Sequence, residues 1–130
     1  MIILLNLINS LNNAILLNKN KINIIKFNTL SLRTLAILQK LNIIESFIIS
    51  SDLKKCSIFL NKNFSKIIAI SKPNRYIYYS LNDLIKLRST DLFNDYIVSI
   101  NNKENTIVTI DDAIYLHKGG LLLFKILKTN

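Results

Sequence analysis

The sequence predicts an α+β protein with two small lobes: residues 1–64 in the order αβαββ, and residues 65–130 rich in strands with short helices. Half of the 130 residues are hydrophobic, which is enough apolar surface for a core. Apolar residues recur at helical spacing in two stretches of the first half, whereas short apolar runs dominate the second. A polar, basic connector at residues 61–66 separates the halves and sets the expected boundary.

The first 17 residues predict an amphipathic helix packed on a sheet. The apolar residues at helical spacing are Leu4, Leu7, Ile8, Leu11 and Ile15. Asparagines interrupt the stretch well short of the roughly 20 apolar residues that a membrane span needs, and it lacks the marks of a signal peptide. A helix lying on a membrane surface is the alternative, but its polar face should carry lysine, and no basic residue precedes Lys19.

A strand at residues 22–27 and a second helix are predicted next. Asn28 or Thr29 can cap the helix N-terminus, and Asn42 marks its end. Four leucines along one side of this helix are predicted to form its buried face, and two further apolar residues are predicted to widen that face. These residues are Leu32, Leu35, Leu38 and Leu41, with Ala36 and Ile37.

Residues 43–50 and 56–60 are apolar runs joined by the polar residues 51–55, a pattern typical of a β-hairpin. Cys56 begins the second run and is expected to be a buried strand thiol. Because it is the single cysteine, the chain forms no internal disulfide.

The second half predicts strands with short helical turns between them. Residues 67–70 and 76–79 are predicted strands on either side of a turn, and residues 95–100 form a further strand. Residues 82–87 predict one short helix, and the polar residues 101–105 predict a loop.

A last short helix is predicted between two strands. Residues 107–108 are apolar, and Thr109 opens the sequence TIDD, which resembles a capping box. Gly119 lies where this helix should end in a left-handed residue, and residues 121–127 are long enough for a buried strand. The single histidine, His117, is expected at the surface or the helix end, because no second soft metal ligand lies near it.

The charge of the chain points to a polyanionic partner. Its 17 basic and 8 acidic residues give a formal net charge of +9, and neutralising phosphates releases condensed counterions. RNA, DNA and an anionic membrane all remain possible on this ground. The acidic residues are scattered, and the sequence has neither a glycine-rich phosphate loop nor a metal-ligand cluster. We therefore predict no enzymatic activity, no cofactor, no metal and no small-molecule substrate.

The only proline lies in the segment ISKPNRYIY, residues 70–78, between two apolar runs. Pro73 fixes φ at the second position of a turn, and Asn74 tolerates the left-handed conformation. Lys72 and Arg75 are therefore expected on a rigid corner where they can bind phosphate. An ordinary solvated turn is the alternative.

Hydroxyl and amide side chains accompany basic residues on two of the predicted loops. Such groups can bond to phosphate, ribose 2′-OH and base edges, through which folded RNA is recognised. The residues are Ser71, Lys72, Asn74 and Arg75 at the turn, and Ser99, Asn101, Asn102, Lys103, Asn105 and Thr106 further along the chain.

Residues 70–78 resemble the Ile-Ser-Lys-Pro-Gly-x-Arg-x-Tyr stretch of the universal small-subunit ribosomal protein eight family. Asn74 stands where the family has glycine, and Tyr78 matches the family tyrosine. Upstream, residues 7–14 (LINSLNNA) resemble the family's first-helix segment Met-Leu-Thr-Arg-Ile-Arg-Asn-Ala. Residues 37–44 (ILQKLNII) resemble its Ile-Leu-Lys-x-x-Gly-Phe-Ile segment.

The C-terminal part also resembles this family, so that the similarity spans most of the chain in order. The residues that resemble the family's Thr-Asp-x-Glu-Ala and Gly-Gly-Glu ending are Thr109, Asp112, Ala113, Gly119 and Gly120. Besides Asn74, the chain departs from the pattern in its first helix, after the two glycines and in one loop. Ser10 and Asn12 replace first-helix arginines, and Leu121 replaces the last glutamate. The family's Ser-Thr-Ser-Lys-Gly loop corresponds to residues 99–106 with an apparent insertion.

The resemblance implies an αβαββ lobe followed by a β-rich lobe that binds the central domain of small-subunit ribosomal RNA. Family members bind early and help to fold this RNA, and some bacterial ones also repress their own messenger. The expected partners are this RNA and neighbouring small-subunit proteins, with no membrane. The complete set of predicted RNA-binding residues is Asn13, Lys19, Lys21, Ser71, Lys72, Pro73, Asn74, Arg75, Tyr78, Ser99, Asn101, Asn102, Lys103, Asn105, Thr106, Gly119 and Gly120.

The composition favours an organellar origin. Isoleucine, asparagine and lysine are abundant, whereas the chain has two glycines, one proline and no tryptophan, as an AT-rich genome would produce. No arginine-rich transit peptide is visible, so we expect a mitochondrial ribosome and an organellar gene, with a plastid as the alternative. Two other functions stay open: a free RNA-binding translational repressor and a peripheral membrane protein.

Overall fold

A computed structural model of the chain describes residues 2–100 and 106–129. The chain divides into two compact units. Unit 1 comprises Met1–Ile67 with Thr129–Asn130, and unit 2 comprises Ile68–Lys128. Each unit combines helices with an antiparallel sheet, which confirms the predicted α+β fold in two lobes. The division falls after Ile67, three residues later than the boundary expected from the polar connector.

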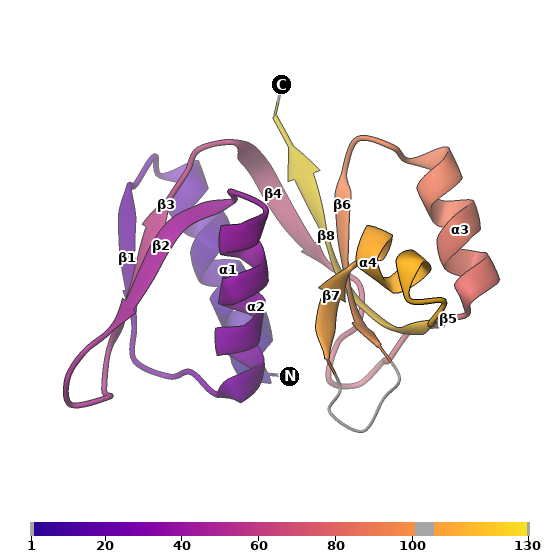
Figure 1. Cartoon of the computed structure of the whole chain (residues 1–130). Helices are drawn as coiled ribbons and strands as arrows, with labels where there is room; N and C mark the ends of the chain where they lie inside the picture. The colour runs from indigo at the N-terminus through magenta and orange to yellow at the C-terminus, as the bar shows by residue number, and fades with distance from the viewer. Residues whose placement is uncertain (1, 101–105, 130) are drawn as a thin grey trace. The chain divides into compact units, whose positions relative to one another are not determined.

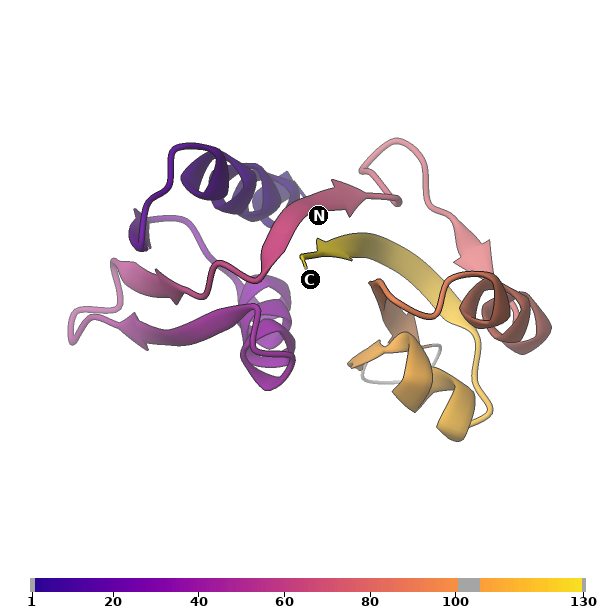
Figure 2. The same ribbon diagram turned by 90° about the horizontal axis from the view of Figure 1, so that it is seen from above.

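Unit 1 follows the order αβαββ, as the sequence predicts. Its elements are α1 (Ile2–Leu16), β1 (Lys21–Ile24), α2 (Thr29–Lys40), β2 (Ile44–Ile49) and β3 (Cys56–Leu60). The three strands form an antiparallel sheet in the order β1-β3-β2. Helices α1 and α2 contact each other and lie on one side of this sheet (Figure 1), which the view from above also shows (Figure 2). Strand β4 (Phe64–Ala69) then crosses the boundary between the units.

Helix α1 buries its apolar side and uses one asparagine to bind a strand. The buried residues are Leu4, Leu7, Ile8, Leu11 and Ala14. The Asn12 side chain donates to the Ile67 carbonyl oxygen at 2.9 Å and accepts from the Ile67 N–H at 2.7 Å. In the described part of the chain, no helix combines the length and apolar character needed to cross a bilayer.

Helix α2 is capped as predicted, and its buried side matches the predicted one in part, at Leu35 and Leu38. The Asn28 carboxamide accepts from the Ser31 N–H at 2.9 Å, and the Ser31 hydroxyl in turn accepts from the Asn28 N–H at 2.7 Å. Ala36 is exposed, so its predicted place on the buried face is wrong. The buried residues are Ser31, Thr34, Leu35 and Leu38. The two hydroxyls can be buried because each donates to a backbone carbonyl of the helix N-terminal region.

Unit 2 has six further elements. They are β5 (Tyr78–Tyr79), α3 (Leu81–Thr90), β6 (Asp95–Ile100), β7 (Ile107–Thr109), α4 (Ile110–Tyr115) and β8 (Gly120–Lys128). β6 pairs with β7 and β8, and β5 pairs with β8. One core cluster joins both helices to the sheet. Its residues are Leu84, Tyr96, Val98, Ile100, Val108, Ile110, Ala113 and Leu122.

Several predicted boundaries shift in the structure. β4 begins at Phe64, inside the stretch expected to be a connector. The sequence did not indicate this start because Phe64 is buried whereas the next two residues, Ser65 and Lys66, are polar and exposed. β1 ends at Ile24 rather than at residue 27. The strand expected at residues 76–79 is reduced to β5, and α3 extends beyond the helix predicted at residues 82–87.

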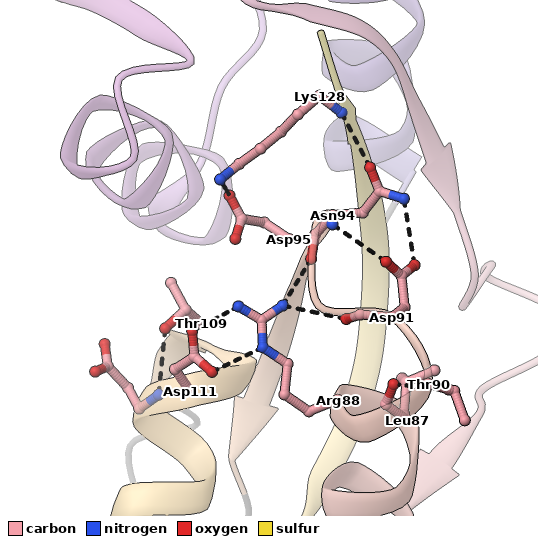
Figure 3. Close-up of polar contacts among 10 residues, drawn as sticks. Leu87, Arg88, Thr90, Asp91, Asn94, Asp95, Thr109, Asp111 and Lys128 are labelled. Atoms are coloured by element: carbon pink, nitrogen blue, oxygen red, sulfur yellow. Dashed lines mark hydrogen bonds and ion pairs between the residues drawn. The ribbon is translucent and has the colours of Figure 1, made fainter. Parts of the chain in front are cut away.

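A polar cluster built on Arg88 holds α3, the following loop and α4 together (Figure 3). The Arg88 guanidinium donates to the Asn94 carbonyl oxygen at 2.8 Å and forms a two-pronged ion pair with Asp111, with both distances 3.0 Å. Asp91, which ends α3, accepts from the Tyr96 hydroxyl at 2.8 Å and from Lys125 at 3.2 Å. The cluster fixes the helices on the core side of the sheet.

Candidate nucleic-acid interface

The turn at residues 72–75 is closed by a pair of backbone hydrogen bonds. The Lys72 N–H donates to the Arg75 carbonyl oxygen at 2.9 Å, and the Arg75 N–H donates to the Lys72 carbonyl oxygen at 2.9 Å. Pro73 and Asn74 occupy the two central positions, where proline restricts the backbone. Asn74 does not adopt the left-handed backbone conformation, although the sequence analysis noted that asparagine tolerates it.

Both cationic side chains of this turn are available to a ligand. Lys72 and Arg75 are exposed, and neither side chain has a hydrogen bond or ion pair within the described residues. A phosphate or another anion could therefore approach both groups without displacing an internal partner. Pro73 and Asn74 are also exposed and form the tip of the turn.

Ser71 anchors the turn from below instead of lying at its surface. Only 3% of the residue is exposed, and its hydroxyl donates to the Leu122 carbonyl oxygen at 2.5 Å while it accepts from the Ile77 N–H at 3.0 Å. The Ile77 carbonyl oxygen in turn accepts from the Leu122 N–H at 2.9 Å. These bonds tie both ends of the turn to β8, so the structure makes Ser71 a support for the turn rather than a group that an RNA could reach.

A second group of predicted residues meets on the sheet face opposite the core cluster of unit 2. Ser99 of β6 is paired with Leu121 of β8, and Leu121 is paired with Tyr78 of β5. Paired residues of antiparallel strands point to the same face, so these three side chains form one row. Tyr78 is 67% exposed, and the row presents a phenol and a hydroxyl with an apolar residue between them.

A shallow depression adjoins this row. It has a volume of about 430 Å³, and its lining is Tyr78, Tyr79, Ser80, Lys118, Gly119 and Gly120. Lys118 is exposed and supplies a cationic group to this lining. The sequence analysis overlooked Lys118, although its position directly before two of the predicted site residues could have indicated it.

The two glycines are required by close packing of backbones. A Cβ atom at Gly119 would overlap the Tyr79 carbonyl oxygen, and one at Gly120 would overlap the Ser99 carbonyl oxygen. Neither glycine is left-handed; the left-handed residue after α4 is His117, so the prediction for Gly119 is wrong. The Lys118 N–H then closes the helix end on the Ala113 carbonyl oxygen at 3.1 Å.

Part of the loop between β6 and β7 carries further predicted residues. Thr106 accepts at its carbonyl oxygen from the Ile100 N–H at 2.9 Å, which continues the β6–β7 ladder. The predicted residues Asn101, Asn102, Lys103 and Asn105 lie outside the described residues.

The three predicted residues of unit 1 are brought together by the fold. Asn13 of α1, Lys19 of the following turn and Lys21 of β1 line one depression of about 470 Å³. Ser10 and Asn23 line it as well, and sequence reasoning missed both because they become neighbours only when α1 packs beside β1. The lining combines amide, hydroxyl and ammonium groups, the set that binds phosphate and ribose.

The positive charge of the protein is concentrated in unit 1. That unit contains nine basic residues and two acidic ones, whereas unit 2 contains eight basic and six acidic residues. In unit 2, Arg88, Lys125 and Lys128 are held by Asp111, Asp91 and Asp95. Unit 1 therefore supplies most of the long-range attraction for a polyanion, and unit 2 supplies a few cations at defined positions.

Comparison with known protein families and with curated protein sequences gives no match to this chain.

Proposed function

We propose that this protein is an RNA-binding structural component of a small ribosomal subunit, bound to the central domain of the subunit's RNA. The observation that carries the proposal is the turn at residues 72–75. Its backbone is closed by two hydrogen bonds, its base is fixed by the buried Ser71, and its two cations have no partner among residues 2–100 and 106–129. Such a turn offers a preorganised contact for an RNA backbone at little ordering cost.

The arrangement of elements supports the same proposal. The order αβαββ in unit 1 and the strand-rich unit 2 agree with the architecture that the family resemblance implies. The row of Ser99, Leu121 and Tyr78 lies on the sheet face opposite the core cluster, where the exposed Tyr78 phenol could contact ribose or base edges.

We place the protein in a mitochondrial ribosome, with a plastid ribosome as the alternative. This part of the proposal is supported only by the abundance of isoleucine, asparagine and lysine. A role at a membrane surface has less support, because the apolar residues of α1 that would enter the lipid are buried within the protein.

Binding to a folded RNA junction tests the proposal. The probe is the central-domain junction of small-subunit RNA, compared with a plain duplex of equal length over a range of salt concentrations. We expect the affinity to fall steeply with salt, because several phosphates are neutralised, and the junction to bind more tightly than the duplex. Equal binding of junction and duplex, or an affinity that salt hardly changes, would contradict the proposal.

A further inference from the structure

The sheet of unit 1 has one face that neither helix of this unit covers. Helices α1 and α2 both lie on the other face (Figure 2). Cys56 and Ile58 of the central strand β3 are buried and therefore belong to the face that the helices cover. Successive side chains of a strand alternate between the two faces, so Ser57 and Phe59 point away from the helices. We call this uncovered side the outer face.

The strand register defines the residues of the outer face. Two rows of paired residues cross the three strands. The first row is Lys21, Phe59 and Ser46, and the second is Asn23, Ser57 and Ile48. The face thus has an aromatic ring on its central strand, surrounded by cationic, amide and hydroxyl side chains.

We propose that the outer face binds a single-stranded RNA segment, with Phe59 as the stacking platform for an unpaired base. The Lys21 ammonium lies 5.4 Å from the centre of the Phe59 ring. When a base stacks on the ring, the lysine side chain can move from the ring to a phosphate of the same RNA strand. An aromatic ring beside a lysine on an open sheet is an arrangement that binds nucleotides without a strict sequence preference.

Asn23 provides polar contacts beside the platform. Its side-chain oxygen accepts from the Ser57 hydroxyl at 2.8 Å, which fixes the carboxamide and leaves its NH₂ group free to donate to a base edge or a ribose. Asn23 and Lys21 also line the depression described above with Asn13 and Lys19. The outer face and that depression therefore form one continuous surface.

Charge complementarity favours a nucleic acid over a protein as the occupant. Exposed lysines border the outer face at both ends of its strands. They are Lys19 and Lys62 at one end, and Lys26, Lys54 and Lys55 at the other. The two acidic residues of unit 1 are Glu45, at the irregular start of β2, and Asp52, whose carboxylate accepts from Ser50 in the turn. A strand of phosphates can follow the lysines while its bases reach the central ring.

This inference goes beyond the proposed function, because it gives unit 1 a binding surface separate from the turn of unit 2. A fluorescent oligouridylate of about eight nucleotides is a suitable probe, since it has no folded shape to be recognised. At low salt, Phe59→Leu should weaken its binding by roughly fivefold or more, and Phe59→Tyr should restore it because the ring is kept. Irradiation of the same oligonucleotide with 5-iodouridine should crosslink it to the peptide that contains Phe59.

Two variants serve as controls. Tyr115→Leu removes a tyrosine that is 82% exposed on unit 2 and should leave binding of the oligouridylate unchanged. Arg75→Ala should weaken binding of the folded junction much more than binding of the oligouridylate, whereas Phe59→Leu should show the opposite order, so that failure of this inference and failure of the proposed function are separate results. Thermal unfolding of Phe59→Leu checks that the variant remains folded.

Three results would overturn the inference. The first is wild-type affinity of folded Phe59→Leu for the oligouridylate, even if Lys21→Gln weakens binding, because the contact would then be electrostatic only. The second is a crosslink confined to peptides outside the outer face. The third is self-association of the protein that Phe59→Leu abolishes without any binding of the oligouridylate, which would assign the face to a protein contact.

Discussion

Arg75 lies on a turn whose backbone geometry does not depend on its side chain. The two hydrogen bonds that close the turn join backbone groups of Lys72 and Arg75, and the anchor below is the Ser71 hydroxyl. We therefore expect Arg75→Ala to reduce affinity for the folded RNA junction by about 1–3 kcal/mol, as loss of a charge-assisted contact does. The midpoint of thermal unfolding should stay the same. Fluorescence anisotropy and a melting curve measure the two quantities.

Pro73→Gly is the matched control for this turn. It keeps both charges and removes only the constraint on φ, so the affinity should fall by roughly 1 kcal/mol through the cost of ordering the loop. A double Lys72→Ala, Arg75→Ala variant that is folded and binds the junction as well as the wild type would show that the turn is merely solvated.

The start of β8 depends on the absence of side chains at Gly119 and Gly120. Gly120 is buried, and an added Cβ atom would overlap backbone atoms of Ser99 and Ile100, which cannot move without breaking the pairing of β6 and β8. Gly120→Ala should therefore lower the free energy of unfolding by about 3 kcal/mol. Denaturant unfolding measures this loss, and a variant as stable as the wild type would contradict the packing described for these strands.

The cluster at the end of α3 gives the protein an acid-sensitive contact. Burial tends to raise the pKa of Asp91, but hydrogen bonds from Tyr96 and Asn94 and the contact with Lys125 outweigh it and hold the pKa well below its ordinary value. The stabilisation is therefore present above the unfolded-state pKa of about 3.9 and is lost as the pH falls through the lower folded-state value.

Asp91→Asn tests this contact. At neutral pH the variant should be less stable than the wild type by about 1–3 kcal/mol, because hydrogen bonds to a charged acceptor are lost. Below about pH 4 the difference should shrink, because the Asp91 carboxylate becomes protonated first in the unfolded state and only at lower pH in the folded protein. Denaturant unfolding curves of both proteins between neutral and acid pH measure this difference in the free energy of unfolding. A difference that does not change with pH would contradict the stabilising role of the Asp91 charge.

At the scale of elements, the sequence predicted what depends on local patterns. The spacing of Leu4, Leu7, Leu11 and Leu35 and the capping residue Asn28 identified both helices of unit 1 correctly. Gly119 was misassigned because its need for glycine comes from the carbonyl oxygen of Tyr79, forty residues earlier in the sequence. A local pattern cannot show such a contact.

The candidate site was predictable to a similar degree. The turn at residues 72–75 was visible because proline and its basic neighbours are adjacent in the sequence. The row of Ser99, Leu121 and Tyr78 could not be foreseen, because it depends on the register of three strands. The burial of Ser71 could not be foreseen either, because its hydroxyl donates to the carbonyl oxygen of Leu122, which lies far along the sequence in β8.

On the scale of the whole molecule, the two units divide the properties that an RNA-binding protein needs. Unit 1 carries most of the net positive charge, and unit 2 carries the preorganised turn and the row of hydroxyl-bearing residues. In the proposed function, long-range attraction would depend on unit 1 and decrease with salt, whereas recognition of a folded RNA shape would depend on unit 2. The same chain can therefore be drawn to RNA in general and still prefer one junction.

Sedimentation of a lysate that contains the protein through a sucrose gradient, with and without ribonuclease, tests the central claim most directly. We predict that the protein sediments with the small ribosomal subunit and moves to the top of the gradient after the RNA is digested. If the protein is found only in the soluble fractions before digestion, or if it stays with a fast-sedimenting particle after complete digestion, it is not held in the small subunit by RNA.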